Sequence, residues 1–240
     1  MKAVILAGGF GKRLKPLTDE RPKPLIEIND KPIVELQLEW LKSHGVQEVV
    51  LCVGFMKEKI IGFLGNGKRF GAKISYVVEE EPLGTGGALL NAEPILKAED
   101  SFLVLNGDIL TNLDPAPLIS SIDDFIGAIA LVPLKSPYGV VDVDEDGRIA
   151  RFIEKPLITD YWVNAGIYCL TPRIFPYLSE KCSLETDAFP RMVEAGALKA
   201  IRYHRCFWKS IDVHKDIEEA AVALRKEGFP TPKAGVGYLR

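Results

Sequence analysis

Two cationic side chains follow a glycine-rich segment near the amino terminus, and this combination of residue types can bind phosphate. The apolar run Lys2–Ala7 leads directly into the segment, and Arg13 and Lys23 come after it. Its glycines are Gly8, Gly9 and Gly11. Glycine lets the backbone approach an anion closely and direct N–H groups toward it. Arg13 adds a planar fork of donors, and Lys23 adds a compact charge on a segment that prolines stiffen on both sides.

The spacing of these residues differs from that of the two commonest phosphate-binding loops. A P-loop carries Ser or Thr after its Gly-Lys pair, whereas Gly11 and Lys12 are followed here by Arg13. The dinucleotide-binding fingerprint has a third glycine at the position that Leu14 occupies. Glycines alone are equally typical of a tight turn, so the phosphate interpretation depends on the whole segment from residue 6 to residue 25.

Two aspartates stand where strands are expected to end. Asp108 follows the apolar run Phe102–Asn106, and Asp212 lies between a strand-like segment and the last helical segment. Ligands of parallel α/β sheets bind at the carboxyl ends of the strands. Mg2+ prefers carboxylate and phosphate oxygens and usually takes one or two protein ligands, so a metal at Asp108 would need a second carboxylate from elsewhere in the chain. Each aspartate alone also fits a structural role, Asp108 in a turn and Asp212 as a helix N-cap.

The elements that must position these residues alternate through the first half of the chain. Strands are expected at Lys2–Ala7, Glu48–Val53, Lys73–Val78 and Phe102–Asn106. Helices are expected between them, the first capped by Asp30, with Pro32 near its first position and Gly45 beyond its end, and the others near residues 56–64 and 86–91. This alternation predicts an α/β fold, a Rossmann-like mixed, mostly parallel sheet with helices on both faces.

The second half of the chain has a different pattern, in which short strands follow one another. Strands are expected at residues 128–132, 139–143, 148–153, 162–170, 200–203 and 207–211, with a hairpin turn at 144–147 and a final helix at 214–226. We therefore expect one domain over residues 1–227, partly antiparallel in its second half, and a loosely ordered tail over residues 228–240.

Composition argues against several classes of protein. The chain has 240 residues, 47% of them hydrophobic and 26% charged, which suits a globular α/β domain with a substantial core. A net charge of −3 argues against nucleic acid as the main partner. No apolar stretch reaches the roughly 18 residues of a membrane span, and the first residues begin a strand rather than a signal peptide. The four cysteines are scattered, as in a reduced cytoplasmic protein.

The whole segment from residue 6 to residue 25 closely resembles the signature of the sugar-1-phosphate nucleotidylyltransferases, and similar motifs continue in order over roughly residues 1–226. The resemblance implies the fold of the nucleotide-diphospho-sugar transferases. It also implies transfer of a nucleoside monophosphate from an NTP to a sugar 1-phosphate. Arg13, Lys23 and Asp108 are then implied to be catalytic, and Asp108 and Asp212 to bind Mg2+. A homodimer is left open.

Further residues acquire roles only through this resemblance. Those implied to contact the nucleotide are Leu6, Ala7, Gly8, Gly9, Gly11, Arg13, Lys23, Glu79, Gly84 and Thr85. Those implied to contact the sugar phosphate are Gly139, Glu154, Lys155, Asn164, Gly166 and Glu185. Each of these is a weak signal when taken alone, since Glu154 and Lys155, for example, form a charge pair of a kind that is common on protein surfaces.

Glu79 is the residue from which a nucleotide preference is inferred. It occupies the position at which similar proteins that use dTTP or UTP commonly carry Gln. A carboxylate can accept the N1–H and N2–H groups of guanine together. On thymine or uracil it would meet carbonyl oxygens, and each buried unpaired group costs about 1–3 kcal/mol. This favours GTP, while Glu80 and Glu81 leave the register open by one residue. Mannose 1-phosphate as the second substrate is what the resemblance implies.

Other substrates and other classes of protein stay open. Guanylyl transfer to a heptose 1-phosphate, and thymidylyl or uridylyl transfer to glucose 1-phosphate, fit the same motifs. A phosphocholine cytidylyltransferase shares the opening signature, but residues 154–156 and 164–166 argue for a sugar. A metal-dependent glycosyltransferase also uses aspartates at strand ends, yet it would not require the loop with Arg13 and Lys23. A non-catalytic regulatory subunit that senses nucleotide sugars is expected to lose the Arg, the Lys or the metal-binding aspartates, and this chain has all four.

Overall fold

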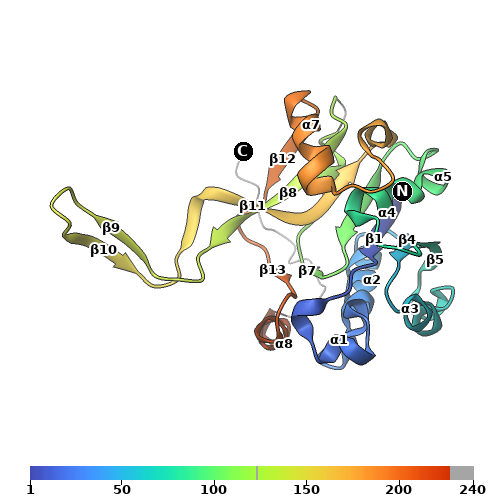
Figure 1. The fold of residues 1–240 in the computed structure, drawn as a ribbon, viewed down its shortest axis with the longest axis horizontal. Coiled ribbons are helices and arrows are strands. Elements are labelled where there is room, and N and C mark those ends of the chain that lie inside the picture. Colours follow the sequence, from blue (N-terminus) through green and yellow to red (C-terminus); the bar gives the residue numbers. More distant parts are fainter. Residues whose placement is uncertain (123, 228–240) are drawn as a thin grey trace.

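The central feature of the fold is a seven-stranded sheet, seen in a computed structural model that describes residues 1–122 and 124–227 (Figure 1). The strand order is β12-β8-β11-β6-β1-β4-β5. The strands of the sheet are β1 (Lys2–Ala7), β4 (Glu48–Val53), β5 (Lys73–Val78), β6 (Phe102–Asn106), β8 (Gly127–Lys135), β11 (Leu157–Leu170) and β12 (Leu198–Arg202). Four of these, β1, β4, β5 and β6, have the predicted bounds.

The sheet is mixed and mostly parallel, as predicted. Strand β1 pairs in parallel with β4 and β6, β4 pairs in parallel with β5, and β12 pairs in parallel with β8. Only β11 is antiparallel to its neighbours β6 and β8 in the described sheet. The carboxyl ends of β1 and β6 therefore meet at one edge, where Leu6 is in register with Asn106.

Helices cover both faces of the sheet because successive side chains of the central strands point to opposite faces. Ala3 and Ile5 of β1 pack with α2 (Ile33–Ser43), α3 (Lys57–Leu64) and α6 (Ala116–Ile119). Val4 packs on the other face, in a core that includes residues of α4 (Gly84–Asn91), α5 (Glu93–Leu96) and α7 (Phe189–Glu194). The expected double-sided arrangement is thus confirmed.

The start of α2 differs from the prediction that Asp30 caps it. Asn29 and Asp30 have positive φ values, 50° and 64°, and form the tight turn between β2 (Glu27–Ile28) and β3 (Lys31–Pro32). Pro32 takes the N-cap position instead, and no side chain caps the helix there. Asp tolerates both a cap and a left-handed turn, and here the two-residue hairpin decides. The predicted glycine beyond the helix end is present, with Gly45 at φ 78°.

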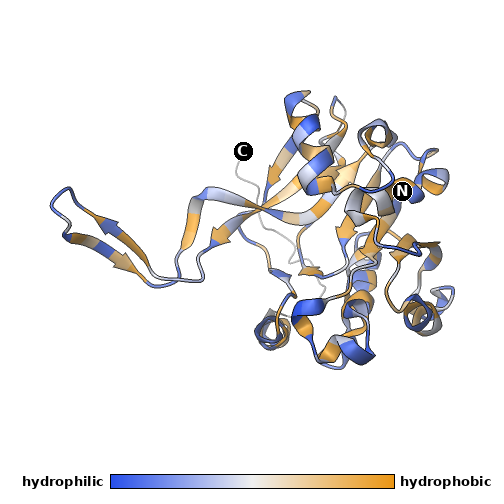
Figure 2. Cartoon of the chain, in the orientation of Figure 1, coloured by the Kyte–Doolittle hydropathy of each residue, from blue (hydrophilic) through white to orange (hydrophobic). Residues whose placement is uncertain are grey.

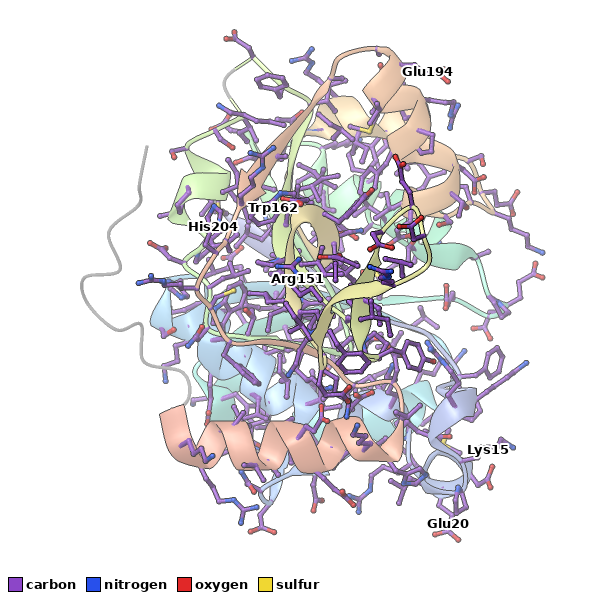
Figure 3. All side chains as sticks on the ribbon, turned by 90° about the vertical axis from the view of Figure 1, so that its left-hand side faces the viewer. Lys15, Glu20, Arg151, Trp162, Glu194 and His204 are labelled. Atoms are coloured by element: carbon purple, nitrogen blue, oxygen red, sulfur yellow. The ribbon has the colours of Figure 1, made fainter. Side chains whose placement is uncertain are left out.

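A two-stranded arm projects from the body, where β8 and β11 continue beyond the sheet (Figure 1). Strands β9 (Val140–Val143) and β10 (Ile149–Ile153) pair antiparallel in the arm, joined by the predicted turn at residues 144–147. The apolar side chains of Val141, Val143, Ile149 and Phe152 remain exposed along it. Figure 2 shows hydrophobic positions among hydrophilic ones on the ribbon of the arm. Where the arm joins the body, the rings of Trp162 and His204 lie edge to face with centroids 4.8 Å apart (Figure 3).

The last elements close the structure beside the amino-terminal segment. Strand β13 (Trp208–Ser210) pairs with β7 (Ile109–Thr111), and α8 (His214–Glu227) follows. Helix α8 packs its predicted apolar side on a third buried cluster that includes Leu14, Ile26 and Leu36. Helix α1 (Leu17–Glu20) completes the elements, with 3-10 turns at Lys12–Leu14, Lys23–Leu25, Lys68–Phe70 and Pro172–Tyr177 and a wider turn at Leu184–Ala188.

Across residues 1–122 and 124–227, no helix is both long enough and apolar enough to cross a membrane. The tail predicted at residues 228–240 lies outside the described residues.

Candidate active site

A cavity of about 400 Å³ opens where the carboxyl ends of β1 and β6 meet. Every residue that the sequence implied for the nucleotide lines it, and so do Asp108 and Asp212. The remaining residues that line it are Phe10, Lys12, Pro24, Pro82, Ala88, Asn106 and Gly107. The cavity therefore brings the glycine-rich segment, the two cations and the two carboxylates to one place. Their roles toward ligands stay predictions.

The four charged side chains form one connected cluster. Lys23 Nζ lies 2.6 Å from Asp108 Oδ2 and 3.1 Å from Asp212 Oδ1. Arg13 Nη2 lies 2.8 Å from the same Asp212 oxygen. The sequence predicted cations that face a phosphate and carboxylates that face a metal, whereas in this structure the two groups pair with each other. Two positive and two negative charges balance, so the cluster can exchange partners when an anion and a cation arrive together.

Local packing explains why the chain presents these cations here. Leu14 in the turn that follows Gly11 is completely buried in the third cluster and anchors Arg13 beside it. Gly11 has φ 60°, and a Cβ there would lie 2.9 Å from the Thr18 methyl carbon and 3.2 Å from Lys23 Cβ. Only glycine fits this position without displacing Lys23. Gly11 in the glycine-rich segment thus leaves the space that the Lys23 side chain occupies.

Asp212 is not the N-cap of α8, which was its alternative role. Asp216 Oδ2 instead accepts hydrogen bonds from the backbone N–H groups of Asp212 and Val213. The Asp212 carboxylate accepts from the Ser210 hydroxyl at 2.7 Å and faces the cations. Burial acts to raise the pKa of Asp212, but the Ser210 hydrogen bond and the Lys23 and Arg13 charges outweigh it and hold the pKa below its ordinary value. Asp212 is therefore ionised and able to hold a cation.

The pair of aspartates fits a magnesium ion by the chemistry of its donors. Their oxygens converge on one ammonium nitrogen, so this position already stabilises positive charge. Mg2+ favours such carboxylate oxygens and keeps water or phosphate in its other positions. No group of three His, Cys, Asp or Glu side chains with metal-binding geometry occurs within the described parts of the chain, and a two-carboxylate site that shares its ion with a substrate does not need one.

Gln37 is a residue that the sequence analysis missed. It lies on the buried face of α2 and is only 2% exposed. Its Nε2 donates to the carbonyl oxygens of Asn106 and Ile109, each at 2.9 Å, and so holds both ends of the loop that carries Asp108. The signal was available, since Gln37 is a lone amide among Ile33, Leu36 and other apolar residues of that helix face.

Replacing Gln37 by leucine is expected to destabilise the protein by about 1–3 kcal/mol, because a buried carbonyl loses its donor. The volume stays similar, so the change removes the two hydrogen bonds together with the buried Oε1, which has no partner among the described residues. Urea unfolding measures the free energy of unfolding. The control is Leu38→Met on the same buried helix. Asn66→Leu also replaces an amide, but Asn66 is exposed and so does not match the burial of Gln37. Equal stabilities for the Gln37→Leu variant and the wild type would contradict the role of Gln37 in holding the loop that carries Asp108.

Glu79 is the one acid of its triplet that faces the cavity. Glu80 pairs with Lys57 and Glu81 pairs with Lys181, both at 2.7 Å on the surface. The Glu79 carboxylate lies over two glycines: a Cβ at Gly8 would be 1.9 Å from Oε1, and one at Gly54 would be 2.6 Å from it. Burial raises the pKa of Glu79 above its ordinary value, against the opposing hydrogen bond from the Leu83 backbone. Its buried Oε2 has no partner among the described residues.

The residues implied for the sugar phosphate fall into two groups. Glu185 accepts hydrogen bonds from Thr85 Oγ1 at 2.7 Å and from Tyr168 OH at 3.2 Å. Asn164 donates to the same Tyr168 hydroxyl at 2.9 Å and accepts from the Gly166 N–H at 2.9 Å. Thr85 lines the cavity, so this group lies beside it.

The second group lies at the root of the arm and is not part of the cavity lining. Gly139 packs under the Phe152 ring, where a Cβ would lie 2.8 Å from the ring. Lys155 has φ 48°, and its Nζ lies 3.5 Å from Glu154 Oε1. The Lys155 side chain is 53% exposed. The structure thus brings Asn164, Gly166 and Glu185 toward the cavity, and leaves the arm residues facing solvent.

Comparison with known proteins shows the family to which the chain belongs. The chain belongs to the nucleotidyl transferase family, whose model matches residues 2–227. It is 32% identical to HddC from Yersinia pseudotuberculosis, with a TM-score of 0.76 over 93% of this chain and 99% of that one. A second crystal structure of HddC, complexed with GMP-PN, gives a TM-score of 0.74 at 31% identity, with the same coverage.

Similar proteins with curated descriptions are longer than this chain. It is 38% identical over 231 residues to the bifunctional protein GlmU of Methanococcus maripaludis, covering 92% of this chain and 53% of that protein. It is also 38% identical over 224 residues to the mannose-1-phosphate guanylyltransferase catalytic subunit beta of Dictyostelium discoideum, covering 90% and 62%. The chain thus spans between about half and three-fifths of the length of these relatives.

Proposed function

We propose that this protein transfers a nucleoside monophosphate from GTP to mannose 1-phosphate and releases pyrophosphate. The observation that carries the proposal is the cavity in which a glycine-rich segment, Arg13, Lys23, Asp108 and Asp212 converge. Membership of the nucleotidyl transferase family supports the reaction class. The names of a guanylyltransferase relative and of a GMP-PN complex of HddC support the guanine nucleotide.

In this reaction a phosphate oxygen of the sugar phosphate attacks the α-phosphorus of the nucleotide. A new P–O bond forms, the bond between the α- and β-phosphates breaks, and pyrophosphate leaves with its electron pair. Both substrates are anions that repel each other, so the protein has to supply positive charge and alignment. Positioning of this kind can lower the barrier by about 7–11 kcal/mol without a covalent intermediate.

The charged cluster and Lys155, at the root of the arm, supply these requirements. Arg13 and Lys23 leave their carboxylate partners and neutralise the triphosphate and the departing pyrophosphate, while Lys155 binds the sugar phosphate. Asp108 and Asp212 hold Mg2+, which when bound supplies further charge neutralisation to the phosphates. The N–H groups of the glycine-rich segment align the phosphates.

Glu79 is proposed to select the base. Its side chain is packed between Gly8 and Gly54, and its unpartnered Oε2 needs a donor. Guanine offers two adjacent N–H donors, which a carboxylate accepts together. Thymine or uracil would place carbonyl oxygens against it. The orphaned acceptor is therefore the feature of the cavity that favours GTP.

Changing Glu79 to Gln is expected to reduce the preference for GTP over UTP and dTTP by about tenfold, because the amide replaces one acceptor by a donor. The ratio of kcat/KM values for the three nucleotides measures the preference. Glu80→Gln is the matched control, since Glu80 pairs with Lys57 on the surface. A preference that is unchanged in Glu79→Gln would show that another group reads the base.

The same residue predicts a pH dependence. Burial raises the pKa of Glu79 above its ordinary 4.5, so the carboxylate becomes protonated as the pH falls through that raised value. Protonation removes an acceptor, and GTP binding should weaken in the wild type on acidification. The Glu79→Gln variant lacks the titrating group and should lose this part of the pH profile, which equilibrium binding of GTP measures.

The sugar is the least constrained part of the proposal. Heptose 1-phosphate with GTP, and glucose 1-phosphate with dTTP or UTP, are the alternatives. A non-catalytic sensor of nucleotide sugars is disfavoured because all four charged residues are present and converge. Pyrophosphate release over a matrix of nucleoside triphosphates and sugar 1-phosphates tests the function, and no release from any pair would reject it. A cytoplasmic location and a homodimer stay predictions.

A further inference from the structure

Asn106 carries a buried oxygen that accepts no hydrogen bond from the described parts of the chain. It is the last residue of β6, two residues before Asp108, and it is one of the residues that line the cavity. Its Oδ1 is buried and finds no hydrogen-bond partner within residues 1–122 and 124–227. Leaving a buried acceptor unpaired is unfavourable, and native proteins satisfy nearly all such groups. An orphaned acceptor on a residue that lines a binding cavity therefore points to a donor on the ligand.

The orphaned oxygen is held in place by its surroundings. Gln37 Nε2 donates to the Asn106 carbonyl at 2.9 Å, and β6 is in register with β1 at Leu6. On the other side Gly166 has φ 67°, and a Cβ there would lie 2.9 Å from Asn106 Nδ2 and 3.3 Å from Asn106 Cβ. The side-chain amide also interacts with the Tyr168 hydroxyl. The amide is thus fixed by packing from both sides rather than free to turn toward a protein donor.

The chemistry of this position selects the ligand group. An amide oxygen only accepts, so the ionised oxygens of a phosphate cannot satisfy it. A hydroxyl group can, and both proposed substrates carry hydroxyls, on the ribose and on the hexose ring. Tyr168 stands next to Asn106, and its own hydroxyl is already engaged with Asn164 and Glu185.

We propose that Asn106 Oδ1 accepts a hydrogen bond from a ring hydroxyl of a substrate, so that Asn106, Gly166 and Tyr168 form a hydroxyl-binding subsite. This inference rests on the proposed function. The subsite distinguishes substrates by the presence of one hydroxyl, because its absence leaves the buried acceptor unpaired.

The test combines variants of Asn106 with deoxy analogues of each substrate. The analogues are 2′-deoxy-GTP, 3′-deoxy-GTP and the monodeoxy forms of mannose 1-phosphate. In the wild type, one analogue should lose about tenfold in kcat/KM relative to its parent, the size of one lost hydrogen bond. In Asn106→Ala the parent substrate should itself lose about tenfold, and that analogue should then lose no more than about twofold further.

The two arms of the experiment separate the sources of the hydroxyl. Loss of discrimination against a deoxy nucleotide assigns the subsite to the ribose, and loss against a deoxy sugar phosphate assigns it to the hexose. If Asn106→Ala discriminates against every analogue as strongly as the wild type does, the subsite is overturned while the proposed function stands. If the wild type turns over no substrate pair at all, the proposed function fails and the subsite with it.

Thermal unfolding distinguishes a subsite from a structural role. Asn106→Leu keeps the volume and removes the unpaired Oδ1 together with the amide contact to Tyr168, so the midpoint of ligand-free unfolding should stay within about 4 °C of the wild type. Asn106→Leu should show the same loss of discrimination as Asn106→Ala. A large fall in the midpoint together with unchanged discrimination would mean that Asn106 serves the fold alone, and would overturn the proposal.

Discussion

Lys23→Ala is expected to lower kcat/KM by about 10²–10³-fold, the usual cost of removing one positioned donor from a developing charge. Lys23 is the most enclosed cation of the cluster, with its side chain 13% exposed, and it contacts both proposed metal ligands. Arg13 is 72% exposed, and within the described residues it forms an ion pair with Asp212 alone. The lysine should therefore contribute more to phosphate neutralisation than the arginine does.

The same variant should remain folded. Loss of the Lys23 side chain leaves Asp108 and Asp212 without their shared ammonium group. The midpoint of thermal unfolding should fall by no more than about 4 °C. Adding MgCl2 should raise that midpoint more in Lys23→Ala than in the wild type, because the ion no longer competes with the ammonium. Lys31→Ala is the matched control, since Lys31 pairs with Glu39 on the surface. An unchanged rate of pyrophosphate release in Lys23→Ala would remove the phosphate-binding argument.

Asp108→Asn should lower the rate by about 10³-fold or more, because charge stabilisation of several kcal/mol depends on the bound ion. Asparagine keeps the shape of aspartate and removes its charge. Pyrophosphate release measured against MgCl2 concentration gives the activity. Binding of Mn2+ measured by electron paramagnetic resonance gives the metal affinity without turnover, and it should also weaken.

The control for this change is Asp142→Asn, on the arm. Asp142 accepts a hydrogen bond from Arg151 at 2.7 Å and is not one of the residues that line the cavity. Its variant should retain both activity and Mn2+ binding. A fully active Asp108→Asn variant, or one that binds Mn2+ as tightly as the wild type, would reject Asp108 as a metal ligand.

The sequence was sufficient for the elements whose signals are local. The strands β1, β4 and β6 are short apolar runs that are largely buried on both faces, and β5 is a short run at the sheet edge. The predicted bounds of all four are those of the structure. Strand β8 was predicted too short, since its continuation into the arm carries mixed residues. The Asp30 cap was wrong because the same residue type also suits the left-handed turn that the hairpin requires.

Ion pairs between residues far apart in the chain could not be predicted from the sequence. Lys23 contacts Asp108 and Asp212, which lie 85 and 189 residues away along the chain. Residue type predicted that all three would serve phosphate or metal, but only the fold shows that they neutralise one another. Gln37 escaped notice for a related reason, because an apolar helix face directs attention to its hydrophobic members. The sequence also left open which of the three glutamates faces the cavity. In the structure Glu80 and Glu81 pair with lysines on the surface, and Glu79 lines the cavity.

The arm has a consequence for how this family can vary. Within the described chain, none of the residues of β9 and β10 belongs to a buried cluster, so the body folds without relying on them. Insertions, deletions and changes of composition there escape the packing constraints that fix the sheet. Natural variants should therefore accumulate length differences in this ribbon first, limited mainly by the solubility of its exposed apolar side chains.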